Sequence, residues 1–247
     1  MSLMNANTYQ HPTAGPISLR IDDRFPGRIE AEVVDSGRAE ITISTDDTAG
    51  PACDAVRNAR ITADGNTIKV TVPAAPGNNM SGTVINVGGG NVIFGSGGGT
   101  VIVNGQIISG GGTSSPVLVR VRIPQGSALS VTTGSSNLEL TGGPLARIDF
   151  DAGSGDLYGA CCDVLDARTG SGDIQVRAMG SGSARTGSGD INIDMAGAVT
   201  ARSGSGDIRL SRCAGAASLQ TGSGDVSAPD SADVHTGSGR VRRIRVR

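Results

Sequence analysis

Apolar and polar residues alternate in short segments along the last hundred residues, and the alternation restarts about every seventeen positions. The tetrapeptide Gly-Ser-Gly-Asp marks each restart, and its aspartates are Asp156, Asp173, Asp190, Asp207 and Asp225. Each aspartate is followed by an aliphatic residue, and in the middle repeats a second aliphatic residue stands two positions further on, after a polar one. This order is typical of a half-buried strand.

A second apolar column precedes the aspartates by six positions, and in three repeats an arginine follows it: Arg168, Arg185 and Arg202. The Gly-Ser-Gly segments supply corners at which a positive φ costs little. At about 3.3 Å per residue, such a repeat suffices for a closed turn of two or three short strands, and successive turns would stack at about 4.8 Å. The pattern therefore predicts an all-β protein, a β-solenoid (β-helix) with coils of about seventeen residues and short glycine corners.

The remaining sequence divides into further regions. We expect residues 1–16 to be a disordered leader and residues 17–81 to form N-terminal β coils with one short helical turn near Asp54–Ala59. Residues 82–113 contain short apolar strands separated by runs of glycine, and we interpret them as a Gly-rich strand insertion, either extra coils or a protruding sheet. Residues 114–247 are then the regular β-solenoid with an Arg-rich end cap.

The composition favours a thin core. Glycine accounts for 39 of the 247 residues, about twice its ordinary share of roughly 7%. Large rings are scarce, with two tyrosines, three phenylalanines and no tryptophan. Stacked coils can bury many small and β-branched side chains instead, because each coil packs only on its neighbours.

The net charge of −2 hides an asymmetry. The final eight residues carry five arginines and no acid: Arg240, Arg242, Arg243, Arg245 and Arg247. A basic patch can meet nucleic acid or an acidic surface, whereas a polar end cap stops the last coil from stacking on another molecule. The end cap is the favoured interpretation, and we expect no nucleic acid as a partner.

The column of aspartates needs compensation, because like charges about 5 Å apart repel. Arg168, Arg185 and Arg202 each lie five residues before an aspartate and could neutralise the column across the corner. Each carboxylate could also accept backbone N–H groups within its own turn. Both interpretations are structural, and the two columns together are the candidate surface ladder.

The repeated Thr-Gly-Ser-Gly-Asp-(Ile/Val)-x-(Val/Ile/Leu) pattern resembles a bacterial domain-of-unknown-function family labelled "putative adhesins", and residues 119–127 resemble the strand that leads into its repeats. The resemblance covers about residues 17–246 and is strongest from residue 117. It implies a β-solenoid, with some members at the cell surface and others in membrane-stress or regulatory settings. The adhesin label rests on architecture, and the family offers no catalytic residues to transfer.

No catalytic, cofactor-binding or metal site is predicted. Calcium needs six to eight converging oxygens, and half-coils such as residues 179–182 contain no acid. Paired carboxylates act in catalysis when their environments differ, but these turns are nearly identical. His11 and His235 each lack a second histidine nearby in the sequence.

The four cysteines are expected to be reduced. Cys162 and Cys213 each fall six residues after a repeat aspartate, so they lie three coils apart, or roughly 14 Å at the strand spacing. That separation is too large for a disulfide.

These features predict a non-enzymatic scaffold or binding module that presents a repetitive surface to a protein partner or an envelope polymer, or self-associates. Two alternatives stay open: a polysaccharide-acting β-helix enzyme, and a stress or regulatory sensor that binds a partner through its Arg-rich end. No signal peptide or membrane-inserting segment is visible, which predicts a cytoplasmic protein. A surface location follows instead if the native N-terminus is missing.

Overall fold

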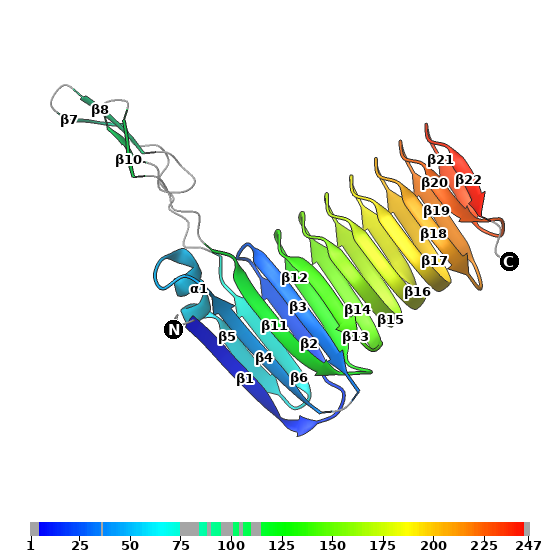
Figure 1. The fold of residues 1–247 in the computed structure, drawn as a ribbon, viewed down its shortest axis with the longest axis horizontal. Coiled ribbons are helices and arrows are strands. Elements are labelled where there is room, and N and C mark those ends of the chain that lie inside the picture. The colour runs from blue at the N-terminus through cyan, green and yellow to red at the C-terminus, as the bar shows by residue number, and fades with distance from the viewer. Residues whose placement is uncertain are drawn as a thin grey trace.

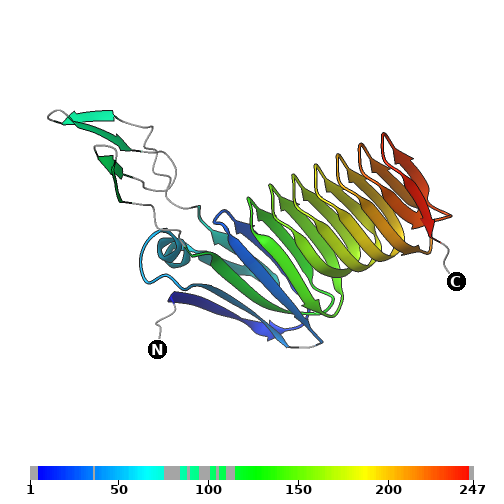
Figure 2. The same cartoon turned by 45° about the horizontal axis from the view of Figure 1, so that its top comes forward.

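The computed structural model describes residues 5–35, 37–74, 84–87, 90–94, 101–103, 106–109 and 115–244. These residues are mostly strand, with one short helix, which confirms the all-β class. Eighteen of the described strands form one large mixed sheet, and four others form a separate sheet. Figures 1 and 2 show the strands of the large sheet stacked side by side along the long axis of the molecule.

The large sheet folds into two faces. Face A begins, in order of hydrogen-bonded neighbours, with β1 (Asn5–Ala14), β4 (Arg38–Thr45), β11 (Val117–Pro124), β3 (Gly27–Val34) and β13 (Asn137–Gly142). It continues with the first halves of three long strands, β15 (Leu157–Thr169), β16 (Ile174–Thr186) and β17 (Ile191–Ser203). It ends with β18 (Ile208–Cys213), β20 (Val226–Pro229) and β22 (Val241–Ile244). Face B contains β5 (Arg60–Asp64), β6 (Thr67–Val72), β2 (Ser18–Asp23), β12 (Ala128–Thr133), β14 (Leu145–Ala152), the second halves of β15, β16 and β17, then β19 (Ala217–Thr221) and β21 (Asp233–Thr236).

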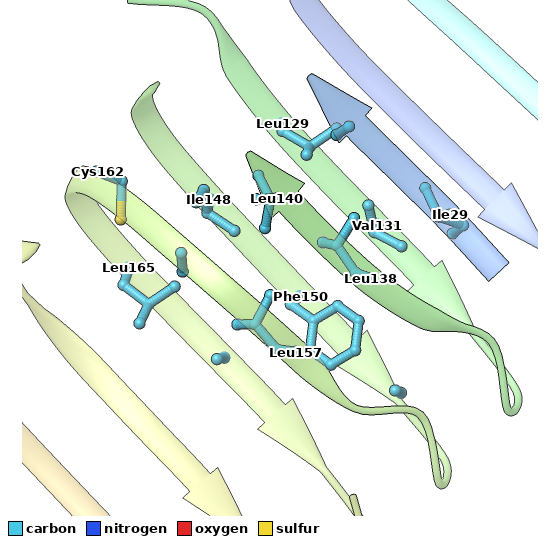
Figure 3. Packing of buried hydrophobic residues seen from close by; sticks show 14 of the residues in the cluster. Ile29, Leu129, Val131, Leu138, Leu140, Ile148, Phe150, Leu157, Cys162 and Leu165 are labelled. Atoms are coloured by element: carbon cyan, nitrogen blue, oxygen red, sulfur yellow. The ribbon is translucent and has the colours of Figure 1, made fainter. Parts of the chain in front are cut away.

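Successive repeats pair in parallel with the predicted register. Ile174 pairs with Ile191, and Ile191 pairs with Ile208, seventeen residues further along each time. Each long strand starts on face A, crosses a bend edge and ends on face B, and the Gly-Ser-Gly-Asp corner then leads to the next coil. Inward residues of the two faces form one apolar cluster. Figure 3 shows part of it, with Phe150 of β14 and Leu157 of β15 directed into the space between the faces.

The corner glycines serve a different purpose from the predicted one. None of them in the Gly-Ser-Gly-Asp repeats has a positive φ. Instead, a Cβ on Gly189 would overlap the carbonyl oxygen of Gly172 in the preceding coil. The Thr186 hydroxyl fixes the same corner, because it donates to the Gly172 carbonyl at 3.0 Å and accepts the Gly189 N–H at 3.0 Å. Close stacking of backbones therefore demands glycine here.

The N-terminal end departs from the prediction of a disordered leader. Residues 5–14 form strand β1, which pairs antiparallel with β4, so that Tyr9 lies opposite Ile41. His11, which lies in this strand, is buried. The segment gave no strand signal because few of its residues are apolar, and the unpaired edge of β4 supplies its hydrogen-bonding partner.

Helix α1 (Pro51–Asn58) is longer than the predicted turn and contacts β1, β4, β6 and β11. It buries Ala52, Cys53, Ala55 and Val56. The helix thereby covers one end of the core between the faces, beside the labels β4 and β5 in Figure 1.

The coils of the N-terminal half are not stacked in chain order. Strand β3 lies between β11 and β13 and pairs in parallel with both, although β11 begins about ninety residues later in the sequence. On face B, β2 likewise lies between β6 and β12. The β2–β3 coil is therefore enclosed by segments that the chain adds much later.

The Gly-rich region contributes β7 (Val84–Val87), β8 (Gly90–Phe94), β9 (Val101–Val103) and β10 (Gln106–Ser109). Neighbouring strands pair antiparallel, in the order β7, β8, β9, β10. Extra coils would pair in parallel, so these strands form a sheet of their own.

Candidate functional site

The five repeat aspartates form a ladder along the corner edge. The Oδ1 atom of Asp173 accepts the backbone N–H of Asp190 at 2.9 Å, and Oδ1 of Asp190 accepts that of Asp207 at 2.7 Å. The bonds that join Asp156 to Asp173 and Asp207 to Asp225 have the same form. The carboxylates therefore accept hydrogen bonds from the next coil, and not from their own turn.

The ladder begins and ends with other side chains. Asn137 supplies the first acceptor, for the N–H of Asp156 at 2.9 Å. At the far end, the N–H of Arg240 donates to Asp225 at 2.7 Å. A guanidinium cannot accept a hydrogen bond, so Arg240 ends this series of contacts.

The predicted neutralisation of the aspartates by arginines is wrong for the described residues. Arg168 pairs with Asp166 at 3.1 Å on its own face. Arg185 and Arg202 form no ion pair within the described part of the chain. The corner turns the chain between the two columns, so the arginines project from face B while the carboxylates bind along the corner edge.

Arg168, Arg185 and Arg202 stand in register on face B, and we call these three residues the arginine ladder. All three are exposed. Gln220 and His235 continue the row into the last two coils.

A second outward row on face B runs beside the arginine ladder, two residues earlier in each strand. It contains Asp166, Ser183, Thr200 and Ser218. The Ser183 hydroxyl donates to Asp166 at 2.9 Å. From β16 onward the two rows together present guanidinium and hydroxyl groups side by side, and Asp166 adds a carboxylate at the β15 end.

Arginines elsewhere in the molecule are treated differently. In the N-terminal coils, Arg120 pairs with Glu30 at 3.0 Å, and Arg122 pairs with Glu32 at 2.9 Å, each across neighbouring strands. Arg147 pairs with an aspartate two residues away at 2.7 Å. These three arginines contrast with Arg185 and Arg202, which have no acidic partner among the described residues.

A groove of about 1000 Å³ follows the bend edge across several coils. Its lining includes Cys161, Met179, Met195, Cys213 and Ile244. Met195 is 46% exposed, more than other large apolar side chains of the described residues. The groove therefore presents an apolar strip between the two faces.

The cysteine predictions hold in the described structure. All four thiols are free, and the register places Cys162 and Cys213 three coils apart, through Met179 and Ala196. Burial raises the pKa of Cys162 to about 12. A thiol in this state is almost fully protonated at neutral pH and is a poor nucleophile.

Asp23 is a buried carboxyl that the sequence analysis missed. Burial raises its pKa to about 6, against the opposing effect of hydrogen bonds from the Ser136 hydroxyl at 2.8 Å and the Phe25 N–H at 3.2 Å. It pairs in register with Thr133, in the column whose hydroxyls fix the other corners. Asp23 could have been identified by its place in the column of corner hydroxyls, but only the pairing of β2 with β12 reveals that place.

The Arg-rich end is partly described. Arg240 and Arg242 are exposed, and Arg243 donates to the carbonyls of Pro229 at 3.0 Å and Ala232 at 2.8 Å. Arg245 and Arg247 lie outside the described residues. Strand β22 pairs only with β20 among the described strands, so its outer edge is open.

The described residues contain no group of three or more histidine, cysteine or acidic residues placed to hold a metal ion. They also contain no helix of the length and hydropathy needed to cross a membrane.

Comparisons with known proteins place this fold. A structure described as a "putative adhesin" from Bacteroides fragilis is similar over 97% of both chains, with 15% identity and a TM-score of 0.55. Two structures from Parabacteroides distasonis, described as a "putative adhesin" and a "putative lipid binding protein", each have a TM-score of 0.49 over 98% of this chain and 97% of theirs, at 9% and 14% identity. No curated protein sequence matches. The Toastrack DUF4097 family model matches residues 29–242, and the chain belongs to that family.

Proposed function

We propose that this chain is a non-enzymatic β-solenoid scaffold that presents a repetitive surface to a protein partner or an envelope polymer. The observation that carries the proposal is the arginine ladder, in which Arg185 and Arg202 are exposed in register without an acidic partner among the described residues. Like charges directly opposite one another on neighbouring strands destabilise a sheet. An external partner that supplies anions to these arginines would relieve the repulsion between them.

The use of the other ionisable groups supports binding over chemistry. The repeat aspartates share one role, since each accepts the N–H of the next corner. An acid–base pair needs two groups whose environments push their pKa values apart. Asp23 has a raised pKa, but it is fully buried against Ser136 and Phe25, where no substrate can reach it.

The C-terminal coil favours a second candidate, self-association or capture of a partner at the Arg-rich end. The open edge of β22 offers unpaired backbone groups, and such edges readily accept a further strand. Val241 on this strand is 44% exposed. An adhesin role, the description given to the similar Bacteroides fragilis structure, fits either candidate.

One set of incubations tests the proposal against enzymatic activity. The protein is mixed with insoluble or immobilised envelope polymers, both neutral and acidic, and both its retention and the release of new reducing ends are measured. We expect at least one polymer to retain the protein and to stay intact. Release of reducing ends in proportion to enzyme concentration would favour the hydrolase or lyase alternative.

Self-association is measured separately by light scattering over a concentration series. A concentration-dependent rise in mass that disappears on deletion of residues 240–247 supports the second candidate. A monomer at every concentration, combined with no retention by any polymer or protein partner, would overturn both.

A further inference from the structure

We propose that the arginine ladder binds a linear acidic polysaccharide whose carboxylates lie on successive coils. The inference rests on the binding function proposed above and names its ligand and its site. The polymer would run along the stack, perpendicular to the strands of face B, across β15, β16 and β17.

The electrostatic contrast within the molecule is the first argument. On face A, Arg120 and Arg122 each lie opposite a glutamate on the neighbouring strand. On face B, Arg185 lies opposite Arg168 and Arg202, and its neighbouring outward row contributes hydroxyls at Ser183 and Thr200. Arg185 and Arg202 have no acidic partner among the described residues, so both guanidinium groups are available for an external anion.

Geometry is the second argument. Neighbouring strands lie about 4.8 Å apart, so the ladder offers one guanidinium per coil at that interval. A polysaccharide with one carboxylate on every sugar presents a row of anions along the direction in which the arginines are stacked. Each planar guanidinium can then bind a carboxylate through two parallel N–H donors.

The hydroxyl row suits the same ligand. Thr200 and Ser218 lie beside the arginine row, where their hydroxyls can hydrogen-bond to a sugar bound along it. Gln220 and His235 extend the polar surface for two further coils. The array therefore offers donors and acceptors over a length of several sugars.

Two other linear polyanions fit less well. Duplex DNA carries one charge per about 1.7 Å, far denser than one guanidinium per coil. An extended acidic peptide places side chains of one face about 6.8 Å apart, which falls out of step with the ladder after one coil.

Affinity gel electrophoresis with polygalacturonate in the gel tests the inference. The variant Arg185→Gln/Arg202→Gln removes the two unpaired arginines. The matched control, Arg120→Gln/Arg122→Gln, changes the net charge equally but removes arginines that already have acidic partners. Mobilities are referred to gels that contain neutral dextran, which corrects for charge, and circular dichroism checks that both variants fold.

We expect polygalacturonate, but not dextran, to retard the wild-type protein, and the effect to weaken as salt is raised. The ladder variant should bind about tenfold more weakly, because it loses two exposed ion pairs, each of modest strength. The control should bind as the wild type does. The affinity of Arg185→Lys/Arg202→Lys should lie between those of the wild type and the ladder variant, because lysine keeps the charge but cannot bind a carboxylate in a bidentate manner.

Other outcomes overturn the inference in distinguishable ways. Equal weakening in both double variants would mean that binding follows net charge, and equal retardation by polyphosphate would mean a general anion surface. If polygalacturonate does not retard the wild-type protein, the proposed ligand is wrong. Retention by another polymer or by a protein partner would still support the proposed binding function. If none of these polymers or protein partners binds, both the proposed ligand and the proposed binding function are wrong.

Discussion

The buried carboxyl of Asp23 makes folding stability depend on pH in a direction opposite to that of most acidic residues. Its pKa rises from 3.8 to about 6 because burial disfavours the charged form. The folded state therefore holds this proton more tightly than the unfolded chain does between those two values. The resulting stabilisation is complete below about pH 4 and is lost as the pH rises through 6.

The magnitude follows from the shift. One pKa unit corresponds to about 1.4 kcal/mol, so a shift of about two units makes the Asp23 contribution about 3 kcal/mol less favourable at pH 7.5 than at pH 4. Asp23→Asn cannot lose a proton and should abolish this part of the pH dependence. The free energy of unfolding of the variant, relative to the wild type, should therefore increase by about 3 kcal/mol over that range.

Urea denaturation at pH 4, 5.5 and 7.5, followed by circular dichroism, measures the difference. Comparing the two proteins at each pH cancels the contributions of other carboxyls. Ser136→Ala provides a second test, because loss of the hydroxyl donor to Asp23 should raise its pKa further and steepen the wild-type trend. Parallel unfolding free energies for wild type and Asp23→Asn at all three pH values would refute the reasoning.

Three further outcomes can be checked. Asp190→Ala should lower the free energy of unfolding by about 1 kcal/mol in urea denaturation, because the N–H of Asp207 loses its acceptor, whereas Asp190→Asn should lower it by less. Gly189→Ala should reduce the melting temperature by several degrees, since its Cβ would overlap the Gly172 carbonyl, and an unchanged melting temperature would contradict the close stacking. Cys162, with its pKa of about 12, should react with iodoacetamide at pH 8 far more slowly in the folded protein than in urea, as measured by mass spectrometry.

The regular coils could be predicted from the sequence because one repeat contains all the information about its own register. Ile174, Ile191 and Ile208 occupy the same place in the repeat, and the structure pairs them accordingly. The role of the aspartates was only half predicted. Sequence places them in one column, but the direction of the N–H that each carboxylate accepts depends on how one corner sits on the next.

The N-terminal half was less accessible for a physical reason. Strand β3 is completed by β11, about ninety residues later, and no local pattern encodes which distant strand will be its neighbour. Strand β1 has few apolar residues and becomes a strand only because β4 offers an edge. Asp23 shares its column with Thr133 through pairing alone, so its burial was invisible in the sequence.

The stacking order has a bearing on how such a protein can change in length. From β15 onward each coil pairs only with the coil before it and the coil after it in the chain. At each corner, the aspartate carboxylate accepts the backbone N–H of the equivalent residue in the next coil. Removing residues 174–190, or duplicating them, would bring equivalent residues of two coils together. The strand register and the hydrogen bonds of the aspartates would then be preserved. The interleaved β2–β3 coil permits no such edit, so whole coils can be added or removed in this way only in the C-terminal half.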